Sequence, residues 1–317
     1  MPRRVSEGFS LLEVLVSILI TTVVTLLVFQ LFQRNEAAFR DQTTIFEMQQ
    51  GARLVLSQIA DEIRMAGQGV PVYAAGFDAA DSDAISVFLA GSGRNRINFR
   101  GDLANAQTGV AGTSSTDFTI GATLSLTVEN ASSISSAAGT RSSGRFVYTW
   151  GQGPNSCWSW IRGELLSISL STRTLTLVPR QMGDGCRQPG LDGLPDSPDD
   201  FVRLEAFPTV TLDQAVSFYL QSESVWRATG MDFSSPGGPD WTASEIGRNF
   251  VSLTFTYLDR DGNRVTPDTL QGRQSIAGVE IEVTAQTAQK LSNGSRASYR
   301  LTTKSIPRNM RIRAHLR

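Results

Sequence analysis

Residues 9–32 of this 317-residue chain read FSLLEVLVSILITTVVTLLVFQLF, and this apolar run decides the fold. Glu13 is the only ionisable side chain among these 24 residues. A helix of that length extends about 36 Å, which is enough to cross the ~30 Å hydrocarbon core of a bilayer. Because Arg3 and Arg4 precede the run, the positive-inside rule predicts a cytoplasmic N-terminus and places the rest of the chain across the membrane.

Two simpler interpretations of the run compete with a functional one. A cleavable secretory signal peptide needs an apolar stretch of about 7–15 residues followed by a small-x-small cleavage site. Here the stretch is longer, and the following FQLFQRNEAAF offers no such site. A plain signal anchor leaves Glu13 unexplained, since a carboxylate one turn into the hydrocarbon is costly and usually has a functional partner.

The start of the run resembles the class III signal of type IV pilins and type II secretion pseudopilins. In that signal a short basic leader ends in Gly, and an apolar helix follows with Glu as its fifth residue; here Gly8 precedes Phe9, and Glu13 is fifth. The resemblance implies that prepilin peptidase removes the leader, residues 1–8, by cutting between Gly8 and Phe9. It also implies N-methylation of the new Phe9 amine.

Electrostatics supports these roles for Phe9 and Glu13. The new terminus is an ammonium group, and in an assembled filament it would be buried among apolar helices. A buried cation needs a counter-ion, which Glu13 of a neighbouring subunit can supply. Such a pair also sets the axial register, because a wrong offset leaves both charges unpaired. We therefore predict that Glu13 guides assembly.

The chain becomes amphipathic after residue 32. Apolar residues recur at steps of three or four, which predicts one face of a helix over 33–67. The stripe consists of Ile45, Met48, Ala52, Val55, Ile59, Ile63 and Ala66. Gly67, Gly69 and Pro71 predict its end. The stripe suits packing on a sheet, as in pilins; a coiled-coil stalk is the alternative.

Residues 68–317 are expected to form one β-rich domain. Alternating runs predict strands at 84–90, 116–120, 123–128, 145–150, 165–170, 174–178, 202–206, 215–220, 250–257, 278–284 and 298–303. Long loops are expected at 100–115, 129–143, 184–200 and 230–242, with a Ser-rich surface loop at 132–144. In the strand at 250–257, Val251, Leu253, Phe255 and Tyr257 are expected to share a face. The predicted class is α+β: a long N-terminal helix packed on an antiparallel sheet, as in the type IV pilin fold.

The C-terminal half resembles PilW-type minor pilins. Val225-Trp226-Arg227 is followed by FVSLTFTYLDRDGNRV, then VEIEVTA, then LTTKSIPRN, in the order seen in that family. The J-type pseudopilin of type II secretion shares much of this pattern, but a length of 317 residues favours the PilW type. Residues 72–200 match no motif, so their role is open.

Two further sites come from residue chemistry. Cys157 and Cys186 are the only cysteines and belong to the part expected in the oxidising periplasm, so we predict a disulfide, with two separate thiols as the alternative. Asp259, Asp261 and Asn263 weakly resemble a calcium loop, but the closing glutamate is missing. The Asp261-Gly262 dipeptide between alternating strands favours a hairpin turn there.

Composition excludes several classes of function. Lys and Arg total 29 against 30 for Asp and Glu, so no net field attracts nucleic acid, and no specific nucleic-acid partner is expected. One His and two Cys make a zinc site or a His-based catalytic triad improbable. The sequence contains no P-loop, GxGxxG, GxSxG or HExxH motif. We expect neither an enzyme nor a cofactor.

The resemblance therefore implies a minor pilin that primes type IV pilus assembly and lies at or near the pilus tip. Its partners would be prepilin peptidase, other minor pilins, the major pilin, the assembly platform and the inner membrane, with a tip adhesin as a further candidate. The chain would cross the inner membrane once, with its C-terminal part in the periplasm before assembly. The alternatives are a J-type pseudopilin and a membrane-anchored periplasmic adhesive or binding module.

Overall fold

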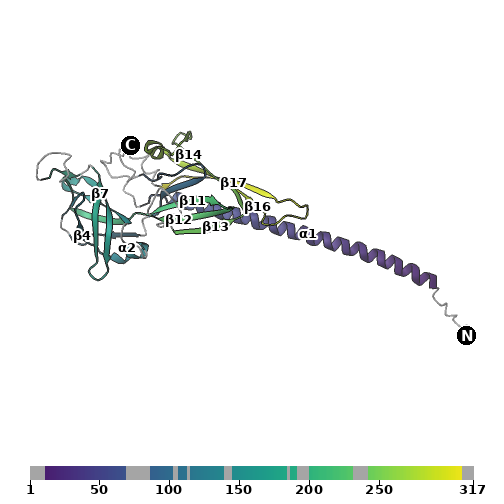
Figure 1. The fold of residues 1–317 in the computed structure, drawn as a ribbon. Coiled ribbons are helices and arrows are strands. Elements are labelled where there is room, and N and C mark those ends of the chain that lie inside the picture. The colour runs from purple at the N-terminus through teal and green to yellow at the C-terminus, as the bar shows by residue number, and fades with distance from the viewer. Residues whose placement is uncertain are drawn as a thin grey trace, which may run out of the picture.

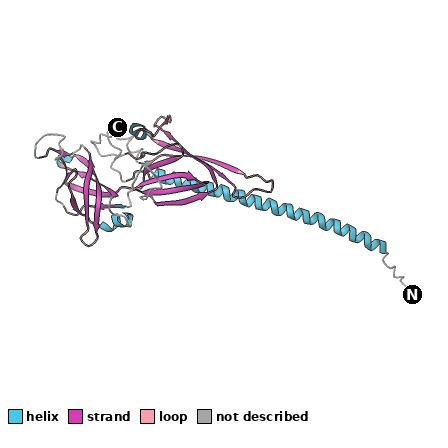
Figure 2. Cartoon of the chain, in the orientation of Figure 1, coloured by secondary structure: helices cyan, strands magenta, loops and turns pink. Residues whose placement is uncertain are grey.

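The computed structural model describes residues 11–68, 86–102, 106–112, 115–138, 145–183, 186–190, 200–230 and 242–308. Figure 1 shows one long helix that leads from the N-terminal end into a β-rich body with two lobes. Strands dominate that body, and its other helices are short (Figure 2). The long helix and the antiparallel sheets confirm the expected α+β, pilin-like fold.

Helix α1 (Leu11–Arg64) is continuous through both its predicted membrane half and its predicted amphipathic half. The predicted apolar stripe is the face that packs on the body, since six of its seven residues are buried and Ile45 is partly buried. The strands beneath it are those of the body itself, mainly β16 (Gly278–Gln286) and β17 (Ser298–Ser305). This packing excludes the coiled-coil stalk.

The end of α1 depends on a glycine. Gly67 follows the helix with φ of 69°, in the left-handed region that glycine adopts readily at helix C-termini. A Cβ atom there would lie 2.7 Å from Cγ2 of Val87. The Gly67 amide donates a hydrogen bond to the Arg100 carbonyl at 2.8 Å. The predicted helix end at Gly67 is thus confirmed, whereas Gly69 and Pro71 lie outside the described residues.

Helix α1 packs on two four-stranded antiparallel sheets. One has the order β1 (Arg96–Arg100), β11 (Ala215–Gln221), β12 (Ser224–Gly230), β13 (Thr242–Arg248). The other has the order β15 (Arg264–Val265), β14 (Phe250–Leu258), β16 (Gly278–Gln286), β17 (Ser298–Ser305). Helix α3 (Leu270–Ser275) lies between β15 and β16 in the chain. We call these sheets, together with the half of α1 that packs on them, the helix-bound lobe.

One hydrophobic core joins α1 to both sheets. Val55 and Ile59 of α1 pack in the same cluster as Phe99 of β1, Phe218 of β11 and Ile281 of β16. All five side chains are at most 2% exposed. Side-chain contacts of this kind hold the amphipathic half of the helix to the body, and they join residues as far apart in the chain as Val55 and Ile281.

The described residues between 106 and 212 form a second lobe, which we call the barrel lobe. Its main sheet has the order β2 (Gln107–Gly109), β10 (Ala206–Leu212), β5 (Arg145–Gln152), β6 (Trp158–Ser169), β7 (Thr174–Met182), β4 (Leu124–Thr127). The edge strands meet, because a β-bridge pairs Val110 with Val128 and the Ala111 amide donates to the Thr127 carbonyl at 2.8 Å. The sheet therefore closes into a six-stranded barrel with an apolar interior.

A smaller sheet and a helix complete the barrel lobe. The sheet has the order β3 (Thr116–Thr119), β9 (Phe201–Leu204), β8 (Arg187–Gln188). Helix α2 (Ala131–Ala138) packs on β2, β10 and β6. A 3-10 turn (Pro154–Ser156) precedes β6.

The barrel lobe is an insertion between two paired strands of the helix-bound lobe. Strand β1 ends at Arg100, strand β11 begins at Ala215, and these two residues are cross-strand partners. The chain thus leaves the helix-bound lobe and returns to it at one place. Residues 68–317, expected as one domain, contain in their described part a second hydrophobic core that belongs to the insertion. This insertion accounts for most of the segment 72–200 that matched no motif.

Several sequence predictions of secondary structure are wrong. The surface loop expected at 132–144 begins as helix α2, because Ala131, Ile134 and Ala138 bury one helical face in the barrel core. Of the strand expected at 84–90, residues 86–90 form only a bridge from Phe88 to Phe99. Strands β1, β10 and β13 were not expected, and β2 and β8 occupy parts of the loops expected at 100–115 and 184–200.

The prediction that alternate residues of 250–257 share one face is correct except at Val251. Leu253, Phe255 and Tyr257 are buried, but Val251 is 55% exposed. The pairing of β14 with β16 shifts register between Phe250 and Ser252. A bulge of this kind turns one side chain to the opposite face of the sheet, which explains the exposure of Val251.

Candidate functional site: the exposed half of helix α1

The first half of α1 projects from the body with its apolar side chains uncovered (Figure 1). An 18-residue window of this helix has a mean hydropathy of 2.6, and none of that window is buried. Among the described residues, α1 is the one helix that is long and apolar enough to cross a membrane. An exposed apolar surface of this size needs a lipid or protein environment.

Glu13 places one carboxyl group on this apolar surface. It lies in the first turn of α1 and is exposed. Within the described part of the chain, no hydrogen bond or ion pair engages its carboxylate; only its backbone carbonyl accepts a hydrogen bond, from Ser17 Oγ at 2.7 Å. A carboxylate in an apolar environment needs a cationic partner from another group. Gly8 and Phe9, the predicted cleavage and methylation residues, lie outside the described residues.

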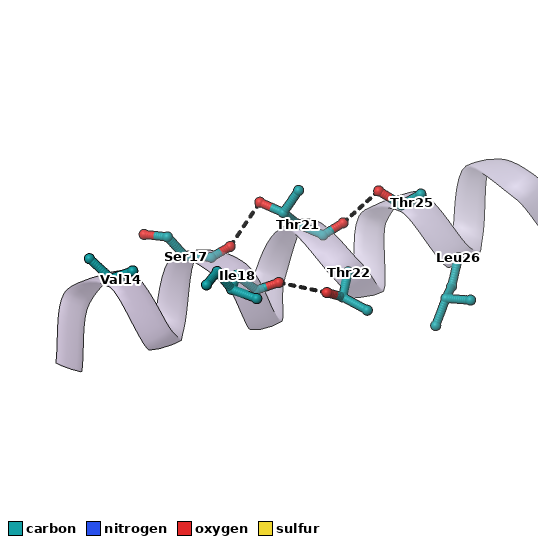
Figure 3. Close-up of a pocket in the computed structure, with 7 residues that line it drawn as sticks. All are labelled: Val14, Ser17, Ile18, Thr21, Thr22, Thr25 and Leu26. Carbon is teal, nitrogen blue, oxygen red and sulfur yellow. Dashed lines mark hydrogen bonds between the residues drawn. The ribbon is translucent and has the colours of Figure 1, made fainter. Parts of the chain in front are cut away.

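A row of small hydroxyl residues follows Glu13 on α1. Ser17, Thr21 and Thr25 are spaced four residues apart and therefore share one face, and Thr22 lies beside them (Figure 3). Thr21 Oγ1 donates to the Ser17 carbonyl and Thr25 Oγ1 to the Thr21 carbonyl, both at 2.8 Å (Figure 3). Each hydroxyl is thus satisfied within the helix, as an apolar environment requires.

The hydroxyl row makes a shallow hollow on the helix, whose rim includes Val14, Ile18 and Leu26 (Figure 3). Small side chains permit close approach of another helix, and this is the usual composition of helix contacts in lipid. Our reading of the sequence did not identify this row. The four-residue spacing of Ser17, Thr21 and Thr25 was the available signal.

Comparison with protein families gives one match. The family model described as "Prokaryotic N-terminal methylation motif" matches residues 3–29, which include the leader junction, Glu13 and most of the apolar run. No curated relative matches this chain. The matched segment is a small part of the chain, so the classification rests on the motif and the fold together.

The class of protein follows from these two findings. The matched motif is the signal of type IV pilins and pseudopilins, and it lies on a long helix that continues into an antiparallel β domain. The motif implies processing by prepilin peptidase and assembly with pilins. It therefore supports membership of the broad pilin superfamily, with a membrane-anchored structural subunit as the implied type of protein.

The two cysteines are joined in the barrel lobe. Cys157 and Cys186 form a disulfide with an S–S distance of 2.05 Å and a Cα–Cα distance of 5.5 Å, as the sequence predicted. The bond ties the start of β6 to the segment before β8. Gly153 lies against it so closely that a Cβ atom would be 2.8 Å from Cys186 Sγ. The disulfide thus belongs to a tightly packed corner of this lobe.

The residues that weakly resemble a calcium loop lie in a hairpin turn between β14 and β15; they are Asp259, Asp261 and Asn263. Asp259 Oδ1 accepts hydrogen bonds from the backbone amides of Asp261 and Asn263, at 2.9 and 2.8 Å. Desolvation raises the pKa of Asp259, but hydrogen bonds from Asn263, Asp261 and Gly262 outweigh it and lower the pKa overall. Among the described residues, no group of three or more His, Cys, Asp or Glu is arranged to hold a metal ion. The predicted hairpin at Asp261-Gly262 is confirmed.

Proposed function

We propose that this chain is a minor pilin of the PilW type, a structural subunit without catalytic activity that primes type IV pilus assembly. The observation that carries the proposal is the division of α1. One face of its second half packs on its own domain, whereas the half that bears the methylation motif stays exposed and keeps a Glu13 carboxylate with which no described residue pairs. Such a half-covered helix suits storage in a membrane followed by transfer into a bundle of helices.

The proposed chemistry at the N-terminus uses three residues. Prepilin peptidase cuts between Gly8 and Phe9 and methylates the Phe9 amine. Glu13 of a neighbouring subunit then balances the charge of that amine in the filament. Before assembly the chain crosses the inner membrane once, with the N-terminus in the cytoplasm and both lobes in the periplasm; afterwards it is part of an extracellular pilus.

The position of the barrel lobe supports a place at or near the tip. The lobe lies at the end of the body away from the projecting half of α1 (Figure 1). In a filament whose helices are parallel, each shaft subunit is followed by another one above it. A subunit with an added barrel on that side fits best where nothing has to stack above it. The partners are then other minor pilins, the major pilin, the assembly platform and, at the free end, a tip adhesin.

The second candidate is a J-type pseudopilin of a type II secretion system, which shares the same signal and fold. The inserted barrel lobe and the length of 317 residues favour the pilus subunit. A display module for adhesion is the third candidate. Glu13 speaks against simple display, since a membrane anchor has no need of a carboxylate in its apolar surface.

Two measurements test the proposal together. Mass spectrometry of the mature chain should find N-methylated Phe9 at its start, and immunogold labelling of the barrel lobe should mark the ends of sheared pili. A chain that begins at Met1, or one cut after residue 32, contradicts the pilin classification. Correct processing with labelled chain confined to secretin-linked complexes, and none on pili, supports the pseudopilin instead.

A further inference from the structure

We propose that the tip of the hairpin between β16 and β17, together with Arg34 of α1, binds the phosphate groups of phospholipid headgroups. The hairpin tip is the connecting segment 287–297, and Lys290 is its contact residue. This contact fixes how the body stands on the membrane before assembly. The inference rests on the proposed function only for the membrane anchor, and it uses neither the priming role nor the position in the pilus.

The hairpin tip is the part of the body that lies nearest to the membrane segment. Figure 1 shows the hairpin of β16 and β17 extending along α1 toward its projecting half. The turn is compact, since the Leu291 amide donates to the Ser295 carbonyl and the Gly294 amide to the Leu291 carbonyl, both at 2.8 Å. An ordered turn therefore lies beside the helix, just above the segment that is predicted to be in lipid.

Asp41 of α1 holds the hairpin tip against the helix. The Ser292 amide donates to Oδ1 of Asp41 at 3.0 Å, and the Ser292 hydroxyl donates to Oδ2 of the same carboxylate. These bonds connect residues that are 251 positions apart in the chain. Hydrogen bonds to an ionised acceptor are stronger than those between neutral groups, so the carboxylate fixes the height of the tip along α1.

Arg34 lies on the same side of α1, directly below this contact. It precedes Asp41 by seven residues, so the two differ by only about 20° around the helix. Ala37, between them, is partly buried, whereas Arg34 is exposed, and so is Lys290 on the tip. In the part of the chain that the structure describes, neither Arg34 nor Lys290 has an ion-pair partner. Two unpaired cations therefore lie at the end of the body that faces the membrane.

Distances along α1 bring both cations to the level of the headgroups. The predicted membrane segment ends at Phe32, and the headgroup region extends roughly 5–8 Å beyond the hydrocarbon. Arg34 is about 3 Å above Phe32 and lies within that region. Asp41 is about 14 Å above Phe32, which leaves about 6 Å between the headgroups and the tip. The long side chain of Lys290 spans such a gap, and a helix tilt of about 20° toward the hairpin narrows it.

The acids on this part of the helix do not oppose a phosphate. Between residues 33 and 41 the acids are Glu36 and Asp41. Glu36 lies about 160° around the helix from Arg34 and pairs with Arg40. Asp41 directs its carboxylate to the hairpin tip. The side of α1 below the tip therefore presents a positive charge to the membrane.

The hairpin tip has the same sign of charge. The segment 287–297 contains Lys290 and Arg296 and no acid. Arg296 lies 3.9 Å from Glu223 of the body, so we assign the lipid contact to Lys290 alone. Each cation close to an anionic lipid surface adds to the attraction, and salt screens that attraction.

The test places the full chain in nanodiscs of phosphatidylcholine with about 30% phosphatidylglycerol. A fluorescent dye on Gln289→Cys, an exposed neighbour of Lys290, reports docking through a quencher attached to the headgroups. Arg34→Gln with Lys290→Gln should lower the ratio of docked to undocked dye roughly thirtyfold. About 1 M NaCl should also undock the dye in the wild type, because it shortens the Debye length to about 3 Å.

The matched control removes two cations from the other end of the same sheet. Arg260→Gln with Arg264→Gln changes the exposed turn between β14 and β15. This turn follows Leu258, which pairs with Gly278 at the end of β16 opposite the hairpin tip. The control should keep the wild-type ratio of docked to undocked dye. Both double variants should keep the wild-type unfolding midpoint, since all four side chains are exposed.

Asp41→Ala tests the positioning of the tip. The variant keeps both cations and removes one acid, so charge alone predicts tighter docking. Loss of the bonds to Ser292 frees the tip, and our inference predicts weaker docking together with faster hydrogen exchange in 288–296. Tighter docking of Asp41→Ala contradicts a contact that depends on a fixed tip.

The outcomes separate this inference from the proposed function. If the wild type inserts but the dye is undocked, or if docking withstands both the loss of Arg34 and Lys290 and high salt, the headgroup contact is wrong and the proposed function stands. Docking that requires a second chain in the same nanodisc assigns the two cations to a subunit contact and also overturns it. A wild-type chain that does not insert removes the membrane anchor and overturns both.

Discussion

Arg100 and Asp213 form an ion pair that is almost completely buried, although they are 113 residues apart in the chain. Nη1 of Arg100 lies 2.5 and 2.6 Å from the two carboxylate oxygens. Arg100 ends β1 of the helix-bound lobe, and Asp213 follows β10 of the barrel lobe. Arg162 of β6 donates Nε to the same carboxylate at 2.9 Å. One acid thus connects the two lobes at the point where the insertion begins and ends.

Replacing this acid should weaken the whole body. Asp213→Asn keeps the size of the side chain but leaves Arg100 and Arg162 without their shared counter-ion in a buried site. Breaking a buried pair in this way costs about 3–5 kcal/mol. Denaturant unfolding of the detergent-solubilised chain measures the loss. Asp117→Asn is the matched control, because its pair with Arg203 is exposed and should be worth at most about 1 kcal/mol. Equal losses in the two variants contradict this account.

The same carboxylate predicts how stability depends on pH. Burial raises the pKa of Asp213, but the charges and hydrogen bonds of Arg100 and Arg162 outweigh burial and hold the pKa below its ordinary value. In the unfolded chain the group has the ordinary pKa of about 3.9. Because the folded pKa is lower, the stabilisation is complete above about pH 3.9 and is lost only as the pH falls through the folded pKa.

The stability gap between the wild type and Asp213→Asn should therefore be constant from about pH 8 to pH 5 and shrink only in stronger acid. Unfolding midpoints of both proteins at each pH measure this gap. A gap that already closes between pH 7 and pH 5 shows that Asp213 is not held ionised by its two arginines.

Removal of the disulfide should weaken the barrel lobe selectively. Cys157 and Cys186 are 29 residues apart, so the bond restricts a loop whose closure is worth about 3–4 kcal/mol on the chain-entropy model. Cys157→Ser with Cys186→Ser should lower hydrogen-exchange protection in β5, β6 and β7. Protection in β14 and β16 should be unchanged, because those strands pack in the other core. A uniform loss over both lobes disagrees with this local effect.

The parts that sequence reasoning predicted well are those with a repeating local pattern. The stripe from Ile45 to Ala66 has the period of a helix, and the alternation at Val279, Ile281 and Val283 has the period of a strand, so each element could be placed without knowing its neighbours. Gly67 ended the helix where expected because left-handed backbone is a local requirement.

The barrel lobe was not predicted because its defining contacts are not local. Closure depends on the pairing of Val110 with Val128, and insertion depends on the pairing of Arg100 with Ala215; neither pair leaves a pattern in the intervening sequence. Helix α2 was missed since only Ala131, Ile134 and Ala138 are apolar anchors in a Ser-rich stretch. Asp213 was not singled out from the sequence, because its role depends on arginines far away in the chain.

The contact between α1 and the sheets should depend on the centre of the stripe. Ile59 is completely buried between the helix and the core of the helix-bound lobe, so Ile59→Ala should destabilise that lobe by about 2–5 kcal/mol. Leu54→Ala is the control on the same helix, since Leu54 is 65% exposed and its loss should change the free energy of unfolding by less than about 0.5 kcal/mol. Denaturant titrations of the full chain compare the two. Similar effects at both positions indicate that α1 is not held by this face.

Glu13 should matter for assembly and not for processing. In the proposed processing, prepilin peptidase acts at Gly8 and Phe9, so Glu13→Ala should be cleaved and methylated at the wild-type level. In the filament the variant leaves the Phe9 ammonium without a counter-ion in an apolar surrounding, a defect worth about 3–5 kcal/mol, and incorporation should fall at least tenfold. Mass spectrometry of the N-terminus measures processing, and the amount of subunit in sheared pili measures incorporation. Glu36→Ala is the control, because that acid lies outside the membrane segment in an exposed pair with Arg40. Wild-type incorporation of Glu13→Ala removes the charge pair from the mechanism, while loss of cleavage assigns Glu13 to peptidase recognition instead.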